Sequence, residues 1–394
     1  MNVFNRNFLK IICTYFSVFL VLVNVGFATP QPFEVRKINP PRLSEKYLGK
    51  HILCHRPMRK ESPMMYVEKN GDKIIAHNYG HGGSGWTLAP GATKYVVNLL
   101  KQKLEEENIS KNEPIAVVGA GVLGLFSALD LLDQGYTDIS ILAEFFDNLA
   151  SHNAGALLAP VSMDNSPDMQ KLIDQIGVEA YKNYKDISEG RHPIFDKRGV
   201  LIVPAYFDTR EESGLEPYVN VVMQPAKDVI LDFQNGTTRK MVAYDDGIFI
   251  NTDILMQNLK QALKDKVKFK KVKIDSFKNV KQKIILNCTG MGSKVMLNDD
   301  KMVSVQGHLI MLKDQNPQDI NHMILVYFGK DKTKSNFKIK RSFYIFPKKL
   351  PESSNDDIGV IGGTFIEGAD KNIPHEEEFK TMIKGAQKFY GIKD

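Results

Sequence analysis

The sequence has 394 residues, of which 43% are hydrophobic and 25% are charged, so the chain can bury a large core. This composition excludes general disorder. Basic residues number 52 against 46 acidic ones, and we expect the resulting charge of +6 to be spread along the chain rather than gathered in blocks. The charge therefore argues against a nucleic-acid-binding protein.

The first expected element is a signal peptide at residues 1–28. Arg6 and Lys10 precede an uncharged apolar stretch that ends in small residues at Ala28. We expect cleavage after Ala28, export to a periplasm or to the outside of the cell, and a single mature unit at 29–394 with no stable membrane span. An uncleaved anchor is the alternative, because the apolar stretch is close to the minimum of about 17 residues for crossing a bilayer.

Cysteine and histidine usage limits the chemistry of the mature chain. Cys54 and Cys288 are too few for a disulfide framework, and Cys288 lies in an apolar run typical of a buried residue. Histidines stand close together in the sequence at His51, His55, His77 and His81. Neither their spacing nor the accompanying carboxylates form a recognised ligand set, so no metal site is expected.

A glycine-rich run follows at 77–88, directly before an expected helix. Such a run lets backbone amides approach a flat or anionic ligand closely. A flexible loop is the alternative interpretation. A linker would hardly carry Tyr79, Trp86 and Leu88, however, so we favour a binding loop.

The most ordered pattern begins with the apolar strand expected at 115–118. A turn with Gly119, Gly121 and Gly124 follows, and then 125–134 has helical apolar spacing. In a dinucleotide-binding turn the first glycine permits the bend, the second lets the backbone approach a pyrophosphate, and the third lets helix and strand pack closely.

A second expected strand, 139–142, leads to Glu144, which stands 20 residues beyond Gly124. A ribose-binding carboxylate belongs at this distance. An ordinary strand, turn and helix with a solvated glutamate is the alternative. Because the acid is in register with both strands and the helix, we predict dinucleotide binding, and an acid at this position disfavours NADP.

Strand-like and helix-like segments alternate along the remaining chain without repeats, which is typical of α/β proteins. In these residues the sequence resembles the D-amino-acid oxidases, within the wider family of FAD-dependent amino-acid oxidoreductases. The segments that carry the resemblance are 119–124 with Glu144, 153–155 leading to Pro160, 284–290, 307–311, 344–347, 362–364, 56–59 and 77–88.

The resemblance implies a Rossmann-like FAD-binding domain with a second, mixed-sheet substrate domain. The order of the segments differs from that of the family, in which the glycine turn opens the chain and the Arg-Pro and glycine-loop segments close it. A circular permutation explains this order, with the old ends joined through 95–113; an unrelated domain fused before the turn is the alternative. The expected FAD-binding part is discontinuous, at about 70–165, 245–300 and 375–394, and the substrate part covers about 45–69, 166–244 and 301–374.

The resemblance also implies the site residues. Arg59 would hold the substrate carboxylate, with Arg56 as the alternative, and the hydroxyl of Tyr344 would contact the same carboxylate. The residues implied in FAD binding are Gly119, Gly121, Val122, Leu123, Gly124, Glu144, Ser151, Gly155, Thr289, Gly290, Gly83, Ser84, Gly85, Trp86 and Thr87.

The implied function is FAD-dependent oxidative deamination of a D-amino acid to a 2-oxo acid, ammonia and hydrogen peroxide, with an amino acid and oxygen as partners. A dehydrogenase that uses another electron acceptor, and a non-catalytic FAD-binding protein, are the alternatives. Lys340 stands where many relatives carry a second tyrosine, and Arg341 follows it. Two cations near the substrate would favour an acidic side chain, or would simply be solvated.

Overall fold

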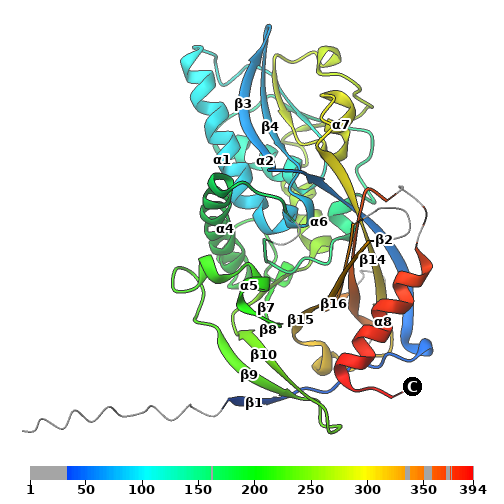
Figure 1. The fold of residues 1–394 in the computed structure, drawn as a ribbon. Helices are drawn as coiled ribbons and strands as arrows, with labels where there is room; N and C mark the ends of the chain where they lie inside the picture. Colours follow the sequence, from blue (N-terminus) through cyan, green and yellow to red (C-terminus); the bar gives the residue numbers. More distant parts are fainter. Residues whose placement is uncertain are drawn as a thin grey trace, which may run out of the picture. The chain divides into compact units, whose positions relative to one another are not determined.

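The chain folds around two β-sheets, which lie in the upper and lower parts of Figure 1. The computed structural model describes residues 33–160, 163–332, 338–349, 357–369, 373 and 375–393. Residues 34–394 form one compact unit, and the expected signal peptide lies outside the described residues. Within the described ranges, every helix is too short or too polar to cross a bilayer.

The smaller sheet contains the glycine turn. Its strands, in spatial order, are β12 (Lys268–Lys271), β6 (Ile139–Ala143), β5 (Ile115–Val118), β13 (Ile284–Asn287), β4 (Lys73–Tyr79) and β3 (Met64–Asn70). All neighbouring pairs are parallel except β3 with β4. Every residue of the central strands β5 and β13 is buried, as expected for a parallel sheet that is covered on both faces.

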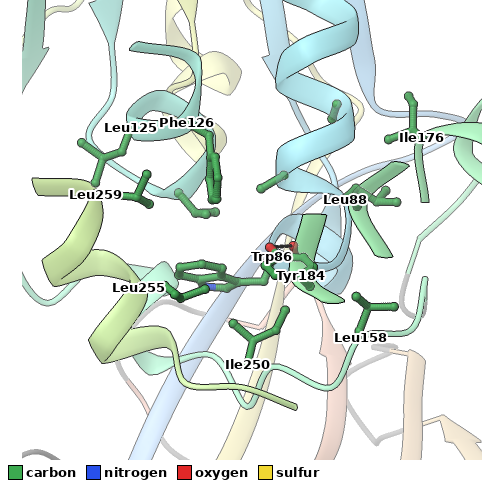
Figure 2. Close-up of a cluster of buried hydrophobic side chains, with 14 of the residues drawn as sticks. Trp86, Leu88, Leu125, Phe126, Leu158, Ile176, Tyr184, Ile250, Leu255 and Leu259 are labelled. Carbon is green, nitrogen blue, oxygen red and sulfur yellow. Dashed lines mark hydrogen bonds between the residues drawn. The ribbon is translucent and has the colours of Figure 1, made fainter. Parts of the chain in front are cut away.

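Helices cover one face of this sheet. They are α1 (Gly85–Glu106), α2 (Val122–Asp133), α4 (Pro167–Ser188) and α6 (Thr252–Leu263). Figure 2 shows the side chain of Trp86, from α1, among Leu125 of α2, Tyr184 of α4 and Leu255 of α6. The Tyr184 hydroxyl donates to the carbonyl oxygen of Trp86 at 2.5 Å. The start of α1 is therefore fixed by three other helices.

The larger sheet is mostly antiparallel. Its spatial order is β1 (Glu34–Lys37), β9 (Lys227–Asp232), β10 (Thr238–Tyr244), β8 (Ala205–Phe207), β15 (Met323–Lys332), β16 (Lys338–Lys349), β17 (Ile358–Glu367), β14 (Met302–Leu312) and β2 (Leu48–Arg59). Helix α8 (Glu376–Tyr390) buries Phe379, Met382 and Phe389 against it. A two-stranded sheet, β7 (Val200–Ile202) with β11 (Ile248–Ile250), and the short helices α3 (Ala150–Asn153), α5 (Arg210–Ser213) and α7 (Ser293–Met296) complete the fold.

The structure confirms the α/β class and corrects two of the expected domain boundaries. Helix α8 packs on β14, β16 and β17 and so belongs with the larger sheet, whereas we expected 375–394 in the FAD-binding part. Strand β3 pairs with β4, so 64–70 belongs with the FAD-binding sheet. The apolar face of α8 and the alternation in β3 predict burial, but neither says which sheet provides the partner.

The segments that precede the glycine turn are integral to both sheets. Strand β2 pairs with β14, and β4 pairs with β13 beside β5. Near the other end of the chain, Ile392 packs against the same hydrophobic cluster as Leu48, while Asp394 lies outside the described residues. Residues 40–112 therefore do not form the separate domain that a simple fusion would produce.

The positive charge is concentrated rather than spread, contrary to our expectation from the sequence. Residues 264–283 contain nine lysines and two aspartates, so the rest of the chain carries 43 basic against 44 acidic residues. All nine lysines are exposed, on the turn after α6, on the edge strand β12 and on the connection to β13. Lysine on an edge strand discourages pairing with a strand of another chain, and this effect is sufficient to explain the concentration of lysines.

Candidate active site

A cavity of about 740 Å³ lies between the two sheets. Its walls come from the glycine turn, the start of α1, the ends of β6 and β12, and the strands β2 and β16. One end is lined by Glu144 and by 272–275, and the other by Arg56 and Tyr344. The cavity thus joins the two groups of residues that the sequence predicts for cofactor and substrate.

The glycine turn has the geometry that a dinucleotide needs. Gly119 has a φ of +113°, and a Cβ there would lie 2.3 Å from the carbonyl oxygen of Cys288. A Cβ on Gly124 would lie 2.0 Å from the carbonyl oxygen of Gly119. Gly121, Val122 and Leu123 line the cavity at the first turn of α2. Backbone therefore approaches the cavity where a pyrophosphate would meet a helix N-terminus.

Glu144 follows β6 directly, is exposed, and lines the cavity beside the end of β12. At the opposite side of the turn, the Ser151 hydroxyl accepts the backbone N–H of Val122 at 3.0 Å. Gly155 also lines the cavity, where a Cβ would lie 3.1 Å from the Phe346 ring. Glu144, Ser151 and Gly155, all within 144–155, thus line the same cavity.

The glycine-rich run ends β4 and opens α1. Gly83, Gly85, Trp86 and Thr87 line the cavity, whereas the buried Ser84 does not. The indole N–H of Trp86 donates to the Ser151 carbonyl at 2.8 Å, and the Thr87 hydroxyl donates to the Ala159 carbonyl at 3.0 Å. The side chains of Trp86 and Thr87 therefore bond to the backbone of the neighbouring segment that contains Ser151 and Ala159. The backbone at the start of α1 lines the cavity and can bind a ligand.

Thr289 and Gly290 follow β13 and also line the cavity. The Thr289 hydroxyl donates to the side-chain oxygen of Asn287 at 2.8 Å, and Gly290 has a φ of +53°. Pro57 of β2 lies 3.5 Å from the position of a Cβ on Gly290. This turn therefore connects the cofactor side of the cavity with the strand that carries Arg56.

The arginine that lines the cavity is Arg56 and not Arg59, the residue that we preferred from the sequence. The Arg59 guanidinium forms an ion pair with Asp299 at 2.8 Å, and among the lining residues of the cavity Arg59 is absent. Arg56 lines the cavity, with its guanidinium carbon 4.5 Å from the ring centre of Phe365 and one N–H on the Thr364 carbonyl at 3.2 Å. The alternation of β2 places the two arginines on opposite sides, and periodicity alone does not say which side faces a ligand.

Tyr344 lies beside Arg56 and stacks on Phe346, with 4.5 Å between the ring centres. Burial raises the pKa of Tyr344 well above its ordinary value, and the neighbouring Arg56 guanidinium opposes that shift. A Cβ on Gly362 of β17 would lie 2.3 Å from the Tyr344 ring, so glycine is what leaves room for this tyrosine.

The other two cations near this end are not free to line the cavity. The Arg341 guanidinium donates to the Glu378 carboxylate of α8 at 2.8 Å and 3.1 Å. The Lys340 ammonium lies 3.5 Å from the ring centre of Tyr327. Within the described residues, neither side chain contributes to the cavity lining.

Sequence reasoning missed His81 and Cys54 as lining residues. His81 is 2% exposed, and burial lowers its pKa to about 4, so its ring is neutral at physiological pH. Both cysteines are buried free thiols, and burial raises the pKa of Cys288 to about 12. The glycines around His81 indicate that it belongs to a binding loop, whereas the place of Cys54 in the cavity wall follows only from the pairing of β2. Among the described residues, no group of three or more acidic, histidine or cysteine side chains is arranged to hold a metal ion.

The fold and cavity define an α/β protein with a dinucleotide site at the glycine turn. The sequence model of the FAD dependent oxidoreductase family (DAO) matches residues 114–393, and the chain belongs to this family. The cofactor of the family is FAD, and the glycine cradle, the first turn of α2 and Glu144 fit its pyrophosphate and ribose.

The chain is similar to a D-amino-acid oxidase of Dictyostelium discoideum, with 27% identity over 231 residues, which are 52% of this chain and 59% of the relative. It thus spans 59% of the length of this curated relative. Among solved structures, L-proline dehydrogenase from P. horikoshii is 13% identical over 71% of this chain and 77% of that one, with a TM-score of 0.47. Iminodiacetate oxidase from Chelativorans sp. BNC1 is 14% identical over 71% and 78% of the two chains, with a TM-score of 0.43.

Proposed function

We propose that this protein catalyses the FAD-dependent oxidation of a D-amino acid to a 2-oxo acid and ammonia, with oxygen as the acceptor that yields hydrogen peroxide. The observation that carries the proposal is the guanidinium of Arg56 at the end of the cavity. Within the described residues it has no carboxylate partner, whereas Arg59, Arg36 and Arg341 each have one. A partly buried cation of this kind favours an anionic ligand, and a carboxylate matches the guanidinium fork.

Arg56 and Tyr344 would bind the substrate carboxylate together. Because the pKa of Tyr344 is raised, its hydroxyl stays protonated and donates a hydrogen bond. Phe346, Leu325 and Phe365 form apolar walls that exclude water from the carboxylate. These contacts orient the α-carbon toward the cofactor side of the cavity, which is the main task of the protein in such a reaction.

FAD, when bound, supplies two-electron oxidation of the substrate C–N bond. The chain supplies the surroundings: the first turn of α1 lines the cavity, and helix N-termini favour negative charge. The glycine turn holds the other end of the cofactor. The similarity to a D-amino-acid oxidase of Dictyostelium discoideum supports the D configuration.

The experiment is anaerobic mixing of the purified holoprotein with a panel of D- and L-amino acids, including acidic and neutral side chains. We expect at least one D-amino acid to bleach the flavin and its L-enantiomer to leave it oxidised. Admitting air should then restore the colour rapidly and release peroxide. Slow reoxidation would support a dehydrogenase, and a flavin that no amino acid bleaches would support a non-catalytic binding protein.

We also propose that the chain is a circular permutation of the family arrangement. The family match begins at residue 114, yet β2 and β4 lie in the two sheets of the same unit. Opening the connection at 107–113 and joining the present ends by a linker should then give a protein that retains FAD. A reordered chain that folds but loses FAD would contradict this proposal.

For residues 1–28 we retain the proposal of a cleaved signal peptide and export. It is supported by the charge and apolar pattern of the sequence. Sequencing the N-terminus of native material should give a start near Thr29. Recovery of Met1 on a membrane-bound form would favour an anchor.

A further inference from the structure

A buried lysine stands behind the cavity wall. Lys348 of β16 has a side chain that is 4% exposed, and burial lowers its pKa. Its ammonium donates to the carbonyls of His152 at 3.3 Å and Ala154 at 3.0 Å and to the Thr252 hydroxyl at 2.9 Å. All three donors of the ammonium are thus used, and the Asp253 carboxylate lies 3.7 Å away. Lys348 does not line the cavity, so the proposed reaction does not use it directly.

The segment that Lys348 holds forms part of the cofactor wall. Ser151, Ala154, Gly155 and Ala156 line the cavity. Ser151 accepts from Val122 of the glycine turn and from the indole of Trp86. This one short segment therefore contacts both structures that would hold FAD.

The same segment contains a strained residue. Ala156 has a φ of +60°, in the left-handed region, which is unfavourable for a residue with a Cβ. Such a conformation persists only when its surroundings impose it. The hydrogen bonds from Lys348 end at Ala154, two residues before this position, and the backbone N–H of Ile250 donates to the Ala156 carbonyl at 2.9 Å.

Lys348 also belongs to the strand of the substrate end. Tyr344 and Phe346 precede it by four and two residues, and Phe346 packs against Gly155 of the held segment. One ammonium therefore ties the cofactor wall to the strand that carries Tyr344. The segment and the strand are nearly 200 residues apart in the sequence, and the Lys348 ammonium connects them in the fold.

We propose that Lys348 is a positioning residue that clamps residues 152–154 to β16 and so fixes the distance between the FAD-binding turn and the substrate end of the cavity. The expected effect on FAD binding depends only on the cofactor site. The expected effect on substrate kinetics rests on the proposed function. The alternative is a buried lysine that merely stabilises the fold.

Lys348→Met tests the clamp, because methionine has a similar length and removes the charge and all three donors. Trp86 is the only tryptophan in the chain and bonds to Ser151, so its emission reports on the held segment. We expect FAD to dissociate from the diluted holoprotein about tenfold faster or more, followed by recovery of Trp86 emission. In the active holoprotein, KM should rise more than kcat falls, since the carboxylate site is displaced relative to the cofactor.

Lys73→Met is the matched control. The Lys73 ammonium also donates to two backbone carbonyls, of Val280 at 2.7 Å and Gln282 at 3.0 Å, but none of these residues lines the cavity. Its FAD dissociation rate and Trp86 emission should match those of the wild type. Equal changes in both variants would show a general loss of stability and would overturn the proposal.

Thr252→Val keeps the test decisive if Lys348→Met does not fold. This change removes one partner of the ammonium, together with the bond that the Thr252 hydroxyl itself donates to the His152 carbonyl at 3.2 Å, and it nearly preserves side-chain shape. We therefore expect a smaller acceleration of FAD release in the same direction. A wild-type rate of FAD release and wild-type Trp86 emission in whichever of these two variants folds would refute the clamp. If no amino acid is oxidised but FAD release responds as expected, the proposed function fails and the clamp stands.

Discussion

The two ends of the cavity bind by different means. At the cofactor end the backbone lies at the surface of the cavity, because Gly119 and Gly121 carry no side chain there, while Gly124 behind them lets α2 pack closely on the turn. At the proposed substrate end, side chains line the cavity, and Arg56 and Tyr344 come from strands that β14 and β17 separate in the sheet. A backbone site depends on a few consecutive residues, whereas a side-chain site depends on strand pairing and register. Substitutions at the two ends should therefore differ in kind.

The largest effect is expected at the cofactor end. In Gly124→Ala the new Cβ would lie 2.0 Å from the Gly119 carbonyl oxygen, so the turn must open and FAD should be lost during purification. Flavin absorbance per mole of protein measures this. Gly236→Ala is the control, because a Cβ there has no neighbour within 4 Å although φ is +85°. Normal FAD content in Gly124→Ala would mean that the turn does not bind the cofactor.

The next effect is at the substrate end. Arg56→Ala should retain FAD but lose about 30-fold to several thousand-fold in kcat/KM, as expected when about 2–5 kcal/mol of a buried charge pair is lost. Arg59→Ala should lower the melting temperature, because Asp299 loses its partner, and should leave kcat/KM close to that of the wild type. A larger kinetic loss in Arg59→Ala would restore our sequence-based preference for that residue.

Tyr344→Phe should have a smaller effect, of about 10- to 100-fold in kcat/KM, because it removes one hydrogen bond to a charged group and preserves the ring stack on Phe346. Steady-state kinetics on the best substrate, with FAD content determined in parallel, measure it. Tyr390→Phe is the control, since this buried hydroxyl on α8 has no hydrogen-bond partner among the described residues. Equal activity of Tyr344→Phe and the wild type would remove Tyr344 from the site.

The smallest effect concerns stability at the cofactor end. Burial raises the pKa of Asp130, on α2, from 3.8 to about 7, so the folded protein binds a proton that the unfolded chain releases between these values. The contribution of this proton to the free energy of unfolding is fully present below about pH 4 and is lost as the pH rises through about 7. Asp130→Asn should therefore be more stable than the wild type near pH 8, by about 1.4 kcal/mol for each unit of the pKa shift, and nearly equal to it near pH 4. Urea denaturation at both pH values tests this, and an unchanged difference between them would show that Asp130 does not titrate in this range.

The comparison also explains which predictions the structure changed. Residues 119–123 of the glycine turn, Glu144 and the loop before α1 line one cavity, whereas Gly124 does not line it; each is a local pattern in which spacing fixes geometry. Ser84 does not line the cavity, since within a turn the spacing does not fix which residue points inward. The concentration of lysines at 264–283 was visible in the sequence and was overlooked, since a total charge says nothing about its distribution.

The sequence by itself determined the α/β class, the dinucleotide turn and the resemblance to FAD-dependent oxidoreductases, because a strand, a glycine turn and a helix are specified by neighbouring residues. Only the tertiary structure decided between Arg56 and Arg59, assigned α8 to the larger sheet, and placed Lys348 on the segment at 152–154. Each of these depends on which surfaces meet across long separations in the chain. A hydrophobic or charge pattern shows that a residue needs a partner, but the partner is selected by packing of the whole fold.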